Sequence, residues 1–267
     1  MLKNKINNFI NKEISKYGDF NSYDLLKTIA FFTMIIDHLG YYFLYNLVFL
    51  RLIGRITIII YAILYGTSLK INKKPNTKTL YFAILTSFIQ FILLGIEEAL
   101  PLNILWCFYF ADYLTNYIEN IYYDNYKLFI LLIILIIPLS YFGNFFIEYG
   151  FGFFMLVFCG RIFSKETKNK KDIINTILIF LMFLIYQIIN FYFNIKYSII
   201  LTTVYIILYN ILYNFKIKPI STAKNTCIKI INNLCIIISR RSMELYTIHL
   251  SLFMLILIIK YKYGYFR

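Results

Sequence analysis

The chain contains few of the residues from which metal centres and disulfide frameworks are built. Its 267 residues include two histidines and four cysteines. The cysteines, at Cys107, Cys159, Cys227 and Cys235, form no Cys-x-x-Cys pair, and at least two lie inside apolar runs. The sequence therefore predicts neither a disulfide framework nor a zinc site, and we expect no metal ion. It also lacks a nucleophile elbow, a phosphate-binding glycine loop and a His-Glu-x-x-His motif, so no reaction follows from a local motif.

Charged residues are scarce as well. They make up 15% of the chain, whereas hydrophobic residues make up 60% and the mean hydropathy is +0.68. Soluble domains have about 25% charged residues, so this composition predicts an integral membrane protein. The net charge of +14 would suggest nucleic acid in a soluble protein. Here the basic residues fall in short loops between apolar runs, so membrane orientation and anionic lipid headgroups explain them and no nucleic acid is expected.

The N-terminus, "MLKNKINNFINKEISKYGDFNSYD", has no short apolar core followed by a small-residue cleavage site. The first membrane helix is therefore expected to act as an uncleaved anchor. We divide the chain into a polar cytoplasmic N-terminus at residues 1–22, a single transmembrane domain at 23–263 and a short tail at 264–267.

Apolar runs of about 20 residues predict membrane-spanning helices. The sequence predicts an all-α, polytopic helical bundle with nine or ten of them. The nine predicted spans cover residues 25–46, 48–69, 79–96, 102–118, 127–142, 146–163, 173–193, 197–215 and 243–260. Residues 227–239 form a tenth candidate, although their length suits an interfacial or re-entrant helix better. Lysines and arginines cluster in alternate loops, which places the N-terminus in the cytoplasm.

Two polar residues stand in the middle of the first predicted span, "LLKTIAFFTMIIDHLGYYFLY". Ionisable groups inside a bilayer cost several kcal/mol and mark functional sites by default. Asp37 and His38 are neighbours on a helix and point about 100° apart, so they are expected to line two walls of one polar cleft rather than to form a dyad.

The second predicted span begins "FLRLIGRITIIIYAILYG" and places Arg51 and Arg55 on one face. Its short link to the first span makes the two helices antiparallel neighbours, so Arg55 can lie at a depth similar to that of Asp37. The last span adds His249. Purely structural roles also remain open for these residues. Arg51 extends to the outer headgroups, Asp37 and Arg55 form a structural ion pair, and His249 is a buried histidine bonded to a carbonyl.

Two adjoining motifs carry a family resemblance. The stretch "YDLLKTIAFFTMIIDHLGYYF" followed by "LRLIGRITIIIYAILYG" resembles the TraX family, in which Asp-His on the first helix precedes Arg-x-x-Gly-Arg on the second. Weaker similarity continues to "MELYTIHLSLF", which is also similar to the ending of broader membrane-bound acyltransferase families. The residues after the second arginine lack the usual Phe-Pro, and "WCFYFADYL" lacks the usual small residues. The resemblance implies a bacterial inner-membrane acetyltransferase that uses acetyl-CoA, with the N-terminal amine of a conjugative pilin as the acceptor in the family prototype.

The resemblance suggests roles for the intramembrane residues. His38 is expected to act as general base, Asp37 to orient the acceptor amine or hold a positive charge, and Arg51 and Arg55 to bind an anionic group or the oxyanion. His249 is a lower-ranked second base. Basic loop residues would attract the phosphates of coenzyme A, namely Lys70, Lys73 and Lys74. Two rivals remain: an O-acetyltransferase acting on a surface glycan, and a proton-coupled transporter, which the lack of a visible inverted repeat disfavours.

Overall fold

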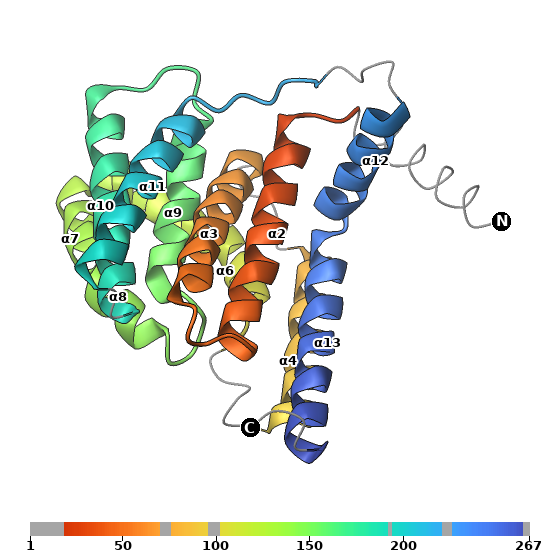
Figure 1. The fold of residues 1–267 in the computed structure, drawn as a ribbon. Helices are drawn as coiled ribbons and strands as arrows, with labels where there is room; N and C mark the ends of the chain where they lie inside the picture. The colour runs from red at the N-terminus through yellow and green to blue at the C-terminus, as the bar shows by residue number, and fades with distance from the viewer. Residues whose placement is uncertain (1–18, 70–75, 96–101, 192–193, 221–225, 264–267) are drawn as a thin grey trace.

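The protein is a bundle of helices (Figure 1). The computed structural model describes residues 19–69, 76–95, 102–191, 194–220 and 226–263. Within these ranges the chain forms eleven helices, and its only β pairing consists of two isolated bridges. The helices are α2 (Ser22–Tyr42), α3 (Val48–Ser68), α4 (Thr77–Leu94), α6 (Ile104–Asp124), α7 (Tyr126–Ile134), α8 (Ile136–Gly143), α9 (Gly150–Phe163), α10 (Lys170–Asn190), α11 (Ile195–Tyr213), α12 (Thr226–Arg240) and α13 (Ser242–Tyr263).

The prediction of an all-α, multi-pass membrane bundle is confirmed. Five helices are long and apolar enough to cross a membrane, namely α3, α4, α10, α11 and the first 19 residues of α13, and the bent pair α7–α8 makes six if it is one span. This number is below the nine or ten predicted spans because polar residues lower the hydropathy of α2 and α6. In addition, α9 has only 14 residues and α12 only 15.

Asparagine side chains fix where many of the helices begin. A helix leaves its first backbone N–H groups without partners, and an asparagine oxygen at the N-cap can accept from them. Such caps precede α2, α4, α6, α7, α10 and α11, and they are Asn21, Asn76, Asn103, Asn125, Asn169 and Asn194. The high asparagine content of the loops therefore sets the helix boundaries.

Two of the predicted spans are interrupted in the structure. The span at 127–142 divides at Leu135 into α7 and α8, which are bent by 58°. Pro138 accounts for the break because it has no N–H to donate to the carbonyl four residues earlier and its ring clashes with that carbonyl. The span at 146–163 begins only at Gly150, because Tyr149 and Gly150 have positive φ angles of 64° and 49° that cannot continue a right-handed helix.

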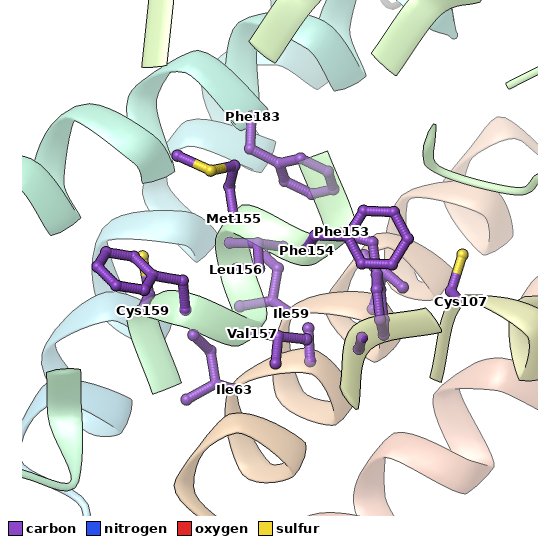
Figure 2. Packing of buried hydrophobic residues seen from close by; sticks show 14 of the residues in the cluster. Ile59, Ile63, Cys107, Phe153, Phe154, Met155, Leu156, Val157, Cys159 and Phe183 are labelled. Carbon is purple, nitrogen blue, oxygen red and sulfur yellow. The ribbon is translucent and has the colours of Figure 1, made fainter. Parts of the chain in front are cut away.

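Helix α9 forms the centre of the bundle. All of its residues except Phe151 are buried, and Figure 2 shows Phe153, Phe154 and Leu156 packed among side chains of neighbouring helices. It crosses α3 at two glycines: a Cβ atom on Gly66 would meet the carbonyl oxygen of Val157, and one on Gly160 would meet that of α3 residue Ile63. Small residues allow such close helix crossings in membrane proteins. Helix α9 is apolar on every side, and the surrounding helices enclose it.

Candidate functional site

A polar cavity of about 290 Å³ opens where α2, α3 and α13 meet the connection between α8 and α9. Its wall includes Asp37, His38, Arg51 and Arg55, which are the residues singled out on the first two predicted spans. The structure thus brings these four side chains to one site. A fifth ionisable side chain, that of Glu148, also lines the cavity.

Asp37 holds both arginines. The Arg55 Nη2 atom lies 2.9 and 2.8 Å from the two carboxylate oxygens, and the Arg51 Nη1 atom lies 2.8 Å from Oδ1. Gly54 allows this contact because a Cβ atom there would collide with the Asp37 side chain. One carboxylate between two guanidiniums leaves a net positive charge at the cavity wall. Such a wall is suited to an anionic group or a developing oxyanion.

The two guanidiniums differ in access. The Arg55 side chain is 1% exposed and lies over the ring of Phe191, with 4.0 Å from Cζ to the ring centroid. The Arg51 side chain is 19% exposed and lies 5.0 Å from the ring of Tyr41. Contacts of this kind between cation and ring hold a guanidinium in place. Arg55 is therefore held in place by its contacts with Asp37 and Phe191, whereas the guanidinium of Arg51 is accessible to a bound molecule.

His38 lines the same cavity and contacts His249 of α13. The Nδ1 atom of His38 lies 2.8 Å from Nε2 of His249. The ring centroids are 5.0 Å apart and the ring planes are inclined by 16°, as for nearly coplanar rings joined edge to edge. Asp37 and His38 consequently contact opposite neighbours, and they form no dyad.

The carbonyl oxygen of Leu245 determines which nitrogen atoms of this histidine pair carry protons. Nδ1 of His249 lies 3.1 Å from the carbonyl oxygen of Leu245, which can only accept a hydrogen bond. In a neutral pair, His249 therefore carries its proton on Nδ1, and its Nε2 accepts from Nδ1 of His38. That assignment leaves Nε2 of His38 with a free lone pair. We name the chain from Leu245 through His249 to His38 the histidine relay.

Glu148 enters the cavity from a non-helical connection. The backbone N–H of Glu148 donates to the carbonyl oxygen of Leu102 at 3.1 Å, and the carbonyl oxygen of Glu148 accepts from the thiol of Cys107 at 3.0 Å. The Glu148 carboxylate accepts from the backbone N–H of Ile104 and forms no ion pair among the described residues. Burial, followed by the negative charge of Asp37, raises the pKa of Glu148 to about 7, although the nearby arginines oppose the shift.

Sequence reasoning did not single out Glu148 as a site residue. A usable signal existed, because this carboxylate lay inside the predicted span at 146–163, where a charge is expensive. The predicted coenzyme-binding residues Lys70, Lys73 and Lys74 lie outside the described residues. Within the described part of the chain, no group of three or more His, Cys, Asp or Glu side chains could hold a metal ion.

These features define a class of protein: a multi-pass helical membrane protein whose polar cavity joins a carboxylate, two arginines and a paired imidazole. A family model described as TraX protein matches residues 22–257, which is nearly the whole chain. The chain belongs to the TraX family.

The chain is also similar to a curated protein of unknown role. An uncharacterized protein of Rickettsia prowazekii (strain Madrid E) is 30% identical over 155 residues, which are 57% of this chain and 59% of the relative. The chain thus spans less than two thirds of the length of that relative. No solved structure matches the chain.

Proposed function

We propose that this protein is a membrane-bound acetyltransferase that moves the acetyl group of acetyl-CoA to an amine of an envelope protein, such as the N-terminus of a pilin-type subunit. The observation that carries the proposal is the histidine relay, which ends on a free imidazole nitrogen beside a cationic cavity wall. Acyl transfer needs both a base for the nucleophile and a positive group for the oxyanion. The family resemblance supports the same reaction.

An amine acceptor arrives as an ammonium ion and must lose two protons during acetylation. Glu148 is placed to hold the ammonium group and take the first proton, because its carboxylate lines the cavity and its pKa of about 7 lies close to physiological pH. The neutral amine then attacks the thioester carbonyl carbon. Nε2 of His38 takes the second proton as the new C–N bond forms.

The tetrahedral intermediate carries its negative charge on the former carbonyl oxygen. Arg51 is the cation with the accessible side chain, so it stabilises this oxyanion, while Arg55 keeps Asp37 in place. When the C–S bond breaks, the thiolate of coenzyme A leaves and receives the proton held by His38. His249 keeps the His38 ring oriented and shares the positive charge through the relay.

The proposal is tested with purified protein in lipid nanodiscs and labelled acetyl-CoA. His38→Ala should reduce acetyl transfer to an amine acceptor peptide by roughly 100-fold or more, as expected for loss of a general base. Asn210→Ala is the matched control, because Asn210 is exposed on α11 and bonds only its own helix backbone. Equal transfer by His38→Ala and wild type would exclude the proposed base.

The acceptor is identified by mass spectrometry of pilins and envelope glycans from a deletion strain. Loss of acetyl from a protein N-terminus supports the proposal, whereas loss from a glycan hydroxyl identifies the O-acetyltransferase instead. Proton-coupled flux in proteoliposomes that contain no acetyl-CoA would assign the site to transport.

A further inference from the structure

A second cavity, of about 150 Å³, follows the first along α2. Tyr23, Lys27 and Met34 of α2 line it, and the next polar residues on the same helix, Asp37 and His38, line the first cavity. At a rise of about 1.5 Å per residue, the three lining positions span roughly 16 Å of helix. Helices α3, α4, α6 and α13 supply the other walls. The second cavity is therefore elongated and ends near the site.

Tyr246 lines both cavities. Its ring centroid lies 5.4 Å from that of His249 and 6.3 Å from that of His38. A molecule that fills the second cavity would thus place its inner end against Tyr246, next to the histidine relay.

The outer end of the second cavity is cationic and its body is apolar. Lys27 forms no ion pair with the described residues; its ammonium lies 5.6 Å from the ring centroid of Tyr23. Arg240 lines the same end, with Asp24 as its ion-pair partner at 3.1 Å. Beyond them the wall is formed largely by side chains such as Met34, Leu64 and Phe108. This polarity suits a slender molecule with an anionic end and an uncharged arm.

We propose that the second cavity binds the acyl donor, an acyl thioester on a phosphorylated pantetheine arm such as that of acetyl-CoA. The phosphates lie at Lys27, the arm follows α2, and the thioester reaches Tyr246 beside His38. The first cavity is then left for the acceptor. This assignment rests on the proposed function and adds to it a site for the phosphates and arm of the donor that is separate from Arg51 and Arg55.

The first test measures binding of acetyl-CoA to the full protein in nanodiscs. Lys27→Gln should raise the Kd of acetyl-CoA about tenfold, the expected effect of losing one charge-assisted contact. Transfer from the short donor acetyl-N-acetylcysteamine, which has no phosphates, should fall less than transfer from acetyl-CoA. Lys196→Gln is the control, because this lysine is exposed at the start of α11. An unchanged Kd in Lys27→Gln would overturn the assignment.

A second test does not depend on Lys27. Cysteine is introduced at Ser242, which lines the second cavity, or at Asn190, which lines the first. Acetyl-CoA, whose sulfur is acylated and does not consume the reagent, should protect Ser242→Cys from a thiol reagent and leave Asn190→Cys reactive, as read by mass spectrometry of each peptide. The reverse pattern, or protection of Ser242→Cys by phospholipid alone, would overturn the donor site.

The outcomes also separate this assignment from the proposed function. If the wild type transfers acetyl but Lys27→Gln binds acetyl-CoA normally and Ser242→Cys is unprotected, the donor site is wrong and the acetyltransferase stands. If the wild type neither binds acetyl-CoA nor transfers acetyl, the proposed function and the donor site fall together.

Discussion

At the scale of single residues, the site is made of groups that act through one another. Both histidines of the chain are in one hydrogen-bonded pair, and the single carboxylate of Asp37 serves both arginines. The predicted interpretation of His249 as a buried histidine bonded to a carbonyl describes one of its two contacts, and the other joins it to His38. Substitutions here should therefore be strongly non-additive.

The relay predicts a specific pattern in a double-mutant cycle. His249→Ala should reduce acetyl transfer roughly 10- to 100-fold, because His38 keeps its ring but loses its orienting partner. The double variant with His38→Ala should be no slower than His38→Ala alone. Initial rates with saturating acetyl-CoA measure both effects, and multiplicative losses would mean that the two imidazoles act independently.

The pKa of Glu148 predicts the acidic limb of the pH–rate profile. A carboxyl with a pKa of about 7 is mostly protonated at pH 6 and ionised at pH 8, so transfer to an amine should rise as the pH increases through 7. The charged and titratable groups around it are Asp37, Arg51, Arg55, Cys107, Tyr149 and Tyr246. Glu148→Gln should lower the rate and remove this limb. A profile that keeps the same limb in Glu148→Gln would assign it to another group.

Substitutions in the buried ion pair of Asp37 and Arg55 should change protein stability and acetyl transfer separately. Asp37→Leu leaves two guanidiniums without a carboxylate and should reduce the free energy of unfolding by roughly 3–5 kcal/mol, as expected when one partner of a buried pair is removed. Adding Arg55→Met should recover much of this loss without restoring acetyl transfer. Thermal unfolding in detergent measures the first effect, and no recovery in the double variant would show that Arg55 is not the main destabilised partner.

At the scale of helices, the close contact of α2 with α3 is the feature that assembles the cationic wall. Gly54→Ala places a methyl group against the Asp37 side chain, so the helices must separate or the ion pair must shift. We expect a loss of about 1–3 kcal/mol in stability, the usual effect of overpacking, together with a large loss of transfer. Ser68→Ala, at the exposed end of α3, should change neither. Wild-type activity in Gly54→Ala would mean that the wall tolerates displacement.

Much of this architecture could be predicted from the sequence because apolar runs and loop residues are local signals. The predicted span at 48–69 corresponds to Val48–Ser68, and that at 173–193 to Lys170–Asn190. The contact between Asp37 and Arg55 could also be predicted from the sequence, because a short link joins the two helices. The pairing of His38 with His249 was not, since it joins residues 211 positions apart. Nor was the backbone turn at Tyr149, whose positive φ angle follows from tertiary contacts and leaves no local pattern.

At the scale of the whole molecule, described basic residues gather at the end where α2 begins. Contacts there involve the starts of four helices and the ends of two others: Ser22 with Lys218, Lys168 with Tyr213, Lys78 with Glu244 and Arg240 with Asp24. The opposite end has fewer described basic residues, among them Arg51, Lys196 and Lys260. The positive-inside rule then favours a cytoplasmic position for the first end, where acetyl-CoA is available.

This orientation is testable with single cysteines. Thr167→Cys, exposed between α9 and α10, should react with a membrane-impermeant maleimide only after cells are opened. Tyr45→Cys, in the link between α2 and α3 where the native side chain is 76% exposed, should react in intact cells. The cysteines at 107, 159 and 235 are buried and give a low background, and the fourth, Cys227, is replaced by serine in both variants. The opposite labelling pattern would invert the proposed orientation.

The contact between α2 and α13 through His38 and His249 has a consequence for biosynthesis. The two imidazoles are encoded 211 residues apart, so at about 5–20 residues per second the ribosome adds the second roughly 10 to 40 s after the first. During that interval a partly inserted chain holds the arginine-rich wall but not the complete relay. The histidine relay is thus completed only near the end of translation, once α13 has joined α2.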